Sequence, residues 1–171
     1  MVKVAFPLNV QNDSAVYEIP YGTIKRPNLG EEHAAQKWVD ISDECWGVSM
    51  LNDSRYGYDV TKNTIRLSIL RSPSQPVENL DDKGIRKVKY ALYPHKGNWC
   101  DAHVMHEGYE FNYPLLTIME GIHTGSLPAK HSFIEILPDN LVIEVLKKAE
   151  DSDDLIIRFY ETTGNDCIAN V

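Results

Sequence analysis

The stretch MVKVAFPLNV, residues 1–10, alternates apolar side chains with polar or small ones. In an extended segment successive side chains point to opposite faces, so Val2, Val4, Phe6 and Leu8 share one face. This period of two predicts a half-buried β-strand whose apolar face packs on a core.

Similar runs, separated by turn signals such as Tyr21-Gly22, follow along most of the chain. Many short strands with one brief helix are typical of an all-β sandwich. Prolines and polar residues at 73–84 predict a surface loop between two strands. Further strands are expected at 15–20, 23–27, 36–42, 46–51, 63–73 and 86–97 and, toward the C-terminus, in LLTIME (115–120), SFIEIL (132–137), LVIEVLKK (141–148) and LIIRFYET (155–162).

The segment 99–115 differs, because it has few β-branched residues. It predicts the short helix, with Asp101 as a suitable N-cap and an end near Phe111. Thr124-Gly125-Ser126 is the best candidate for a domain boundary. The expected domains are a large antiparallel β-sandwich over residues 1–126 and the start of a second, small β-sandwich over residues 127–171.

Composition narrows the classes of partner. Hydrophobic residues make up 43% of the 171, enough for a real core, and the formal net charge is −8. That charge argues against nucleic acid and anionic membranes as partners. The basic residues Arg86, Lys87 and Lys89 are expected on the solvated face of a strand. The three cysteines are far apart, and the N-terminus lacks a signal-peptide pattern, so a cytoplasmic location is expected.

The stretch NDSRYGYDV, residues 52–60, gathers the side chains most typical of a binding site. Asp53 and Asp59 could form an acid–base pair of the kind that glycosidases use. The alternative is a β-hairpin in which Asn52 or Asp53 closes an Asx-turn and the tyrosines pack across strands.

The histidines leave two further interpretations open. His103 and His106 are spaced to share one helix face with Glu107 nearby, which could hold zinc, but no third ligand is obvious. An ordinary, partly exposed helix is the alternative. His95 follows Pro94 in a turn, where it could bond a neighbouring backbone group or line a site.

Several stretches in order resemble the C-terminal region of glycoside hydrolase family 38 α-mannosidases, in the microbial branch of that family. The resemblance covers nearly the whole chain. Its segments are FPLNV (6–10), YEIPYGTIKRP (17–27), AQKWVDIS (35–42), GVSMLNDSRYGYDV (47–60), IRLSILRSP (65–73), YALYPHKGNW (90–99) and LKKAED (146–151) followed by IIRFYETTG (156–164).

The resemblance implies a galactose-mutarotase-like large sandwich and a role beside a catalytic domain. The family's catalytic motif is an early His-rich stretch followed by Asp and Trp, and here no histidine precedes His33. The chain therefore resembles a fragment cut at both ends, with no catalytic residue and no metal site of its own. Zinc and the nucleophilic aspartate are expected in the missing N-terminal catalytic domain, which would be the chain's partner in a retaining hydrolysis of terminal α-mannosides.

The resemblance also implies that the stretch 52–59 forms one wall of the sugar cleft. The residues expected to bind the α-mannoside substrate are Asn52, Asp53, Arg55, Tyr56, Tyr58 and Asp59. The chain alone is expected to be inactive. A free-standing carbohydrate-binding or subunit-contact module and an independent metallohydrolase using His103, His106 and Glu107 are the alternatives, and a homo-oligomer is left open.

Overall fold

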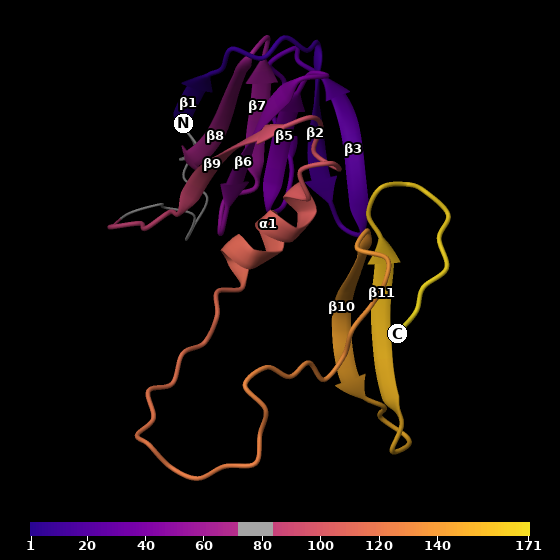
Figure 1. Ribbon diagram of the computed structural model, residues 1–171. Helices are drawn as coiled ribbons and strands as arrows, with labels where there is room; N and C mark the ends of the chain where they lie inside the picture. Colours follow the sequence, from indigo (N-terminus) through magenta and orange to yellow (C-terminus); the bar gives the residue numbers. More distant parts are fainter. Residues whose placement is uncertain (72–83) are drawn as a thin grey trace. The chain divides into compact units, whose positions relative to one another are not determined.

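The structure, a computed structural model, describes residues 1–71 and 84–171. The chain forms two compact units, Met1–Pro114 and Leu115–Val171 (Figure 1). The loop predicted at 73–84 lies outside the described residues except for Gly84. The predicted domain limits near residue 126 stay a prediction; that position lies in the second unit, in a stretch without regular structure.

The first unit contains two antiparallel sheets (Figure 1). In one sheet, a long connection brings the N-terminal strand beside a strand some sixty positions later, in the register Phe6↔Ile65. The four-stranded sheet has the order β1 (Val2–Pro7), β8 (Thr64–Leu70), β7 (Gly57–Thr61), β4 (His33–Ala34), and the five-stranded sheet has the order β3 (Gly22–Pro27), β2 (Ser14–Ile19), β5 (Trp38–Ser42), β6 (Trp46–Asn52), β9 (Tyr90–Lys96).

The core lies between the inner faces of these two sheets, which makes the unit a β-sandwich. Alternate residues supply it, because a strand presents every second side chain to each face. The predicted all-β class is confirmed, and each strand expected in the first hundred residues has a counterpart in one of the two sheets, although the limits differ. The buried core side chains that the strands supply are Ala15, Tyr17, Val39, Ile41, Val48 and Met50 from the five-stranded sheet and Tyr58, Val60, Ile65 and Leu67 from the four-stranded sheet.

Two details of the first unit differ from the sequence prediction. β9 begins at Tyr90, so Arg86, Lys87 and Lys89 precede the strand on which they were expected. The helix α1 (Val104–Asn112) begins three residues after Asp101, and its N-cap is His103, in the left-handed conformation with φ 51°. Asp101 does not cap the helix, because the side chain of Asn98 first folds residues 98–101 into a turn.

The helix α1 packs on the outer face of the five-stranded sheet, against β5 and β6. Gly108 permits the contact, since a Cβ there would lie 2.7 Å from Cδ1 of the buried Trp38. Trp99 adds a second ring, with its centroid 5.3 Å from that of Trp38. Within the described ranges, no helix has the length and apolar character that a membrane span requires.

The second unit contains one hairpin, β10 (Leu141–Lys148) with β11 (Leu155–Glu161). The strands expected at 115–120 and 132–137 do not form; only Leu137 makes an isolated bridge, to Asn170. The reason is that neither run finds a neighbouring strand among the described residues. Their apolar side chains are exposed, Leu116 by 97% and Met119 by 99%.

We expect the second unit to self-associate. A hairpin without a third strand rarely buries its apolar face, and exposed apolar runs bind one another. The chain at micromolar concentration should bind a hydrophobic dye or scatter light as oligomers. Replacing Leu116, Met119 and Phe133 together by serine should lower dye binding and leave the unfolding of the first unit unchanged. A clean monomer that binds no dye would contradict this expectation.

Candidate functional site

The predicted site residues lie where the chain crosses from one sheet to the other. β6 belongs to the five-stranded sheet and β7 to the four-stranded sheet, and residues 53–56 connect them. We call residues 53–56 the corner. The hairpin interpretation is wrong, because β6 pairs with β5 and β9, and β7 pairs with β4 and β8.

The six predicted residues divide into two groups. Asn52 is buried at the end of β6, and Tyr58 and Asp59 are buried within β7. The corner carries the others, and its side chains reach solvent to different degrees. Asp53 and Arg55 are half-buried, whereas Tyr56 is 59% exposed.

Asn52 holds the corner in place through its side chain. Its Oδ1 accepts hydrogen bonds from the backbone N–H groups of Ser54 (2.9 Å) and Arg55 (2.5 Å), an Asx-turn. Its Nδ2 donates to the carbonyl of Gln36 (2.8 Å) and to the hydroxyl of Tyr58. The predicted Asx-turn by Asn52 therefore forms, but it closes a crossing between two sheets.

The main chain of Asn52 is bonded on two further sides. Its N–H donates to the carbonyl of Lys37 (2.9 Å), and its carbonyl accepts from Nδ2 of Asn112 at the end of α1 (2.9 Å). One buried residue thus joins β6, the segment before β5, the corner, β7 and the helix.

Asp59 is fully buried and paired within the four-stranded sheet. Its carboxylate accepts from Nζ of Lys3 (2.5 Å) on β1 and from Nε of Arg66 on β8. Asp53 lies in a different environment, near the surface, where it accepts from the backbone N–H of Lys89 (3.2 Å). An acid–base pair of Asp53 and Asp59 is excluded by this geometry, since Asp59 is closed to any ligand and both its oxygens are engaged.

Arg55 is the residue of the corner with the fewest hydrogen bonds for its side-chain donors. Its Nε is buried and has no hydrogen-bond partner among the described residues. A planar guanidinium offers several donors in a fixed fork, suited to a carboxylate or to neighbouring hydroxyls. The corner therefore carries a guanidinium donor that the rest of the described chain does not use.

A cavity of about 500 Å³ adjoins the corner beside Tyr56. Arg26 lines it and lies 5.1 Å from the ring centroid of Tyr17. Glu18 also lines it and is 1% exposed, bonded to the N–H (2.6 Å) and Nζ (3.0 Å) of Lys37. Burial raises the pKa of Glu18, and Lys37 opposes that rise only in part. Sequence reasoning missed Glu18 and Arg26. Both are charged residues of predicted strands and lie beside Tyr17, and this combination is the signal that could have found them.

His95 does belong to a polar cluster, on the outer face of the five-stranded sheet. Its Nε2 lies 2.8 Å from Oδ2 of Asp40, and the hydroxyl of Ser49 donates to the same oxygen at 2.7 Å. Ser42 donates to Oδ1 (2.7 Å). Burial lowers the pKa of His95, but the hydrogen bond and charge of Asp40 outweigh burial and raise it above 6.5. Both oxygens of Asp40 are therefore engaged within the sheet, and the cluster helps to hold the strands together.

The described residues offer no set of ligands that would support the zinc interpretation. The rings of His103 and His106 have centroids 6.0 Å apart at the start of α1. Across residues 1–71 and 84–171, no three His, Cys, Asp or Glu side chains are grouped as metal ligands. Zinc in a separate catalytic domain stays a prediction.

Two family models match the chain. Residues 1–82 match the glycosyl hydrolases family 38 C-terminal domain, and residues 140–171 match the glycosyl hydrolases family 38 C-terminal beta sandwich domain. A solved glycosyl hydrolase family 38 protein from Enterococcus faecalis shares the fold, with a TM-score of 0.79 at 20% identity over 98% of this chain and 21% of that one.

Relatives in three eukaryotes are similar along nearly the whole chain. Alpha-mannosidase 2C1 of Homo sapiens is 36% identical over 97% of this chain, alpha-mannosidase G of Dictyostelium discoideum 34% over 91%, and alpha-mannosidase of Saccharomyces cerevisiae 31% over 99%. The chain spans only 17% of the human protein's length, 15% of the Dictyostelium protein's and 17% of the yeast protein's.

Asn52→Ala should destabilise the first unit by about 2–4 kcal/mol, because several buried groups lose their partner at a typical cost of about 1–3 kcal/mol each. Urea unfolding followed by tryptophan fluorescence would measure it. The neighbouring Asp53→Ala, near the surface, is the control and should cost less than about 1 kcal/mol. Equal losses in the two variants would contradict the role given to Asn52.

The His95–Asp40 pair predicts a pH dependence of stability. Because the folded pKa of His95 is raised, its contribution is fully present below about pH 6.5 and is lost as pH rises through the folded pKa. The free energy of unfolding should therefore fall across that interval, and His95→Gln should remove this slope. The exposed His123→Gln is the control. An unchanged slope in His95→Gln would show that another group titrates.

Proposed function

Because the chain belongs to glycosyl hydrolase family 38, in which it corresponds to the C-terminal region, we propose that it is the non-catalytic part of an α-mannosidase and that its corner forms one wall of the sugar cleft. The curated relatives are named alpha-mannosidases, and each is several times longer than this chain. The reacting groups would then come from the N-terminal catalytic domain, and this chain would supply position and shape.

One observation supports the cleft wall above all others: the backbone of the corner is fixed where it is attached, and the guanidinium that it carries has a buried donor without a partner among the described residues. Asn52 fixes the backbone of Ser54 and Arg55, while Nε of Arg55 has no partner in the described ranges. A donor held in place before binding loses little conformational freedom when a ligand arrives. A merely structural arginine would be tied to Asp53 or Asp59, and Asp59 is instead taken by Lys3 and Arg66.

Within this proposal the six residues have two roles. Arg55 and Tyr56 contact the α-mannoside or a carboxylate of the catalytic domain, with Asp53 beside them as an acceptor. Tyr56 offers an aromatic face with a polar tip, which suits the C–H face and hydroxyls of a sugar. Asn52, Tyr58 and Asp59 are positioning residues, because they are buried and bonded within the sandwich.

Zinc would assist the retaining hydrolysis from the catalytic domain, and this chain's contribution is to bind and orient. A cytoplasmic location is part of the proposal. Its support is that Cys45, Cys100 and Cys167 form no disulfide in the part of the chain that the structure describes, as expected in a reducing compartment.

The proposal predicts that Arg55→Ala in the complete enzyme lowers kcat/KM by about 5- to 150-fold, the equivalent of about 1–3 kcal/mol for a charged hydrogen bond. In the 171-residue chain the same change should shift the free energy of unfolding by less than about 0.5 kcal/mol, because the half-buried Arg55 side chain makes no hydrogen bond to a described residue through its buried Nε that the change would break. Kinetics with an aryl α-mannoside and urea unfolding would measure the two effects.

Arg158→Ala, at an exposed arginine of β11, is the matched control and should leave kcat/KM unchanged. If Arg55→Ala lost stability while its kinetics stayed intact, residues 53–56 would be a structural connection only.

A further inference from the structure

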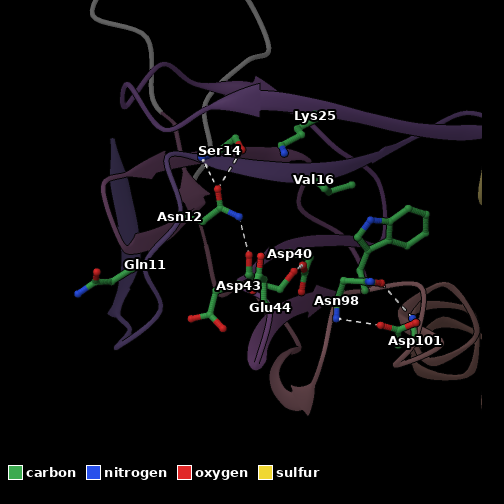
Figure 2. A pocket seen from close by; sticks show the side chains of 12 residues that line it. Gln11, Asn12, Ser14, Val16, Lys25, Asp40, Asp43, Glu44, Asn98 and Asp101 are labelled. Atoms are coloured by element: carbon green, nitrogen blue, oxygen red, sulfur yellow. Dashed lines mark hydrogen bonds between the residues drawn. The ribbon is translucent and has the colours of Figure 1, made fainter.

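A second cavity opens on the outer face of the five-stranded sheet, at the opposite end of β5 from the corner (Figure 2). Its volume is about 480 Å³, within the roughly 300–1,000 Å³ of small-ligand sites. β2, β3, the end of β5 and the turn before α1 all contribute to its lining, which includes Gln11, Lys25, Asp40, Glu44, Trp99 and Asp101.

The walls of this cavity are fixed by short hydrogen bonds. Oδ1 of Asn12 accepts from the N–H and hydroxyl of Ser14, both at 3.1 Å, and its Nδ2 donates to the carbonyl of Ser42 at 2.5 Å. Asp43 accepts from the N–H groups of Cys45 (2.8 Å) and Trp46 (3.0 Å), and these bonds hold its pKa below the usual value. The cavity therefore keeps its shape and an anionic wall at neutral pH.

Three exposed side chains around the cavity have unused bonding capacity. Gln11, Lys25 and Glu44 make no side-chain hydrogen bond or ion pair within the part of the chain that the structure describes. Figure 2 shows Lys25 on one side of the cavity and Glu44 on the other. They offer an amide, an ammonium group and a carboxylate, so both donors and acceptors are available to one ligand.

The lining suits a sugar better than an ion. A sugar ring has hydroxyls that donate and accept, and C–H faces that pack on aromatic rings. The polar groups above match the hydroxyls, and the half-buried indole of Trp99 supplies an aromatic surface. A metal ion is not favoured, since the described residues form no group of three metal-ligating side chains. A polyamine is not favoured either, because its positive charges would be repelled by the ammonium group of Lys25.

We propose that this cavity binds one hexose unit of a carbohydrate, at a site separate from the corner. Its floor is the buried Asp40 with Ser42, and Gln11, Lys25 and Glu44 contact the hydroxyls. The site would let the chain hold a glycan at a second point, which the cleft wall does not provide. This proposal does not depend on the proposed function of the corner.

The test is a titration of the 171-residue chain, at micromolar concentration, with methyl α-mannoside and methyl α-glucoside, followed by tryptophan fluorescence and by calorimetry. We expect saturable binding of at least one glycoside. Gln11→Ala and Glu44→Ala should each weaken it at least fivefold without changing Tm, because both side chains are exposed and unbonded. Trp99→Phe should remove most of the fluorescence response.

Arg158→Ala, at an exposed arginine of β11 that lines neither the cavity nor the corner, is the control and should bind the glycoside as the unaltered chain does. No saturable binding of either glycoside would overturn the proposal. So would equal affinity in Gln11→Ala and Glu44→Ala, or binding of spermidine alone. Loss of kcat/KM in Arg55→Ala bears only on the corner, so the two proposals can fail independently.

Discussion

The buried side-chain amide of Asn52 is the constraint on which the first unit depends. A chain that leaves one sheet and enters the other must turn where no ladder partner is available, and buried N–H groups without partners are costly. Asn52 supplies an acceptor to two of them and ties the same point to Gln36, Tyr58 and, through its carbonyl, Asn112. The hydrogen bonds of this one residue therefore help to hold both sheets and the helix in place relative to one another.

The same need for hydrogen-bond partners explains why the many carboxylates of this chain do not indicate an acid–base pair. A buried carboxylate persists only if it is paired and hydrogen-bonded. Asp59 is paired with Lys3 and Arg66, Glu18 with Lys37, and Asp40 with His95. The groups with unused capacity lie elsewhere, at the corner and around the cavity of Figure 2. Hydrogen-bond partners within the chain thus distinguish the carboxylates that hold the fold from the groups that are left to meet a ligand.

Sequence patterns predicted what is local and failed where a distant partner decides. Alternation located the strands of the sandwich, because their core faces impose the period of two. It could not show that β6 and β7 belong to different sheets, since that depends on β8 and β9. The runs 115–120 and 132–137 alternate as well but have no strand to pair with in the described chain. Likewise, Asp59 looked available until Lys3, distant in sequence, was placed beside it.

The two units differ in how firmly their own contacts hold them, and this difference limits the kind of binding that each unit can support. The first unit fixes the corner from several directions, so a donor there can be held to the tolerance that recognition requires. In the second unit only Leu141, Val142 and Thr162 are buried among the described residues, and most apolar side chains face solvent. Such a surface cannot position a ligand, but it can be covered by another part of a larger protein. The sandwich is therefore the unit that can hold ligand-binding groups in fixed positions, and the hairpin unit offers an exposed apolar surface.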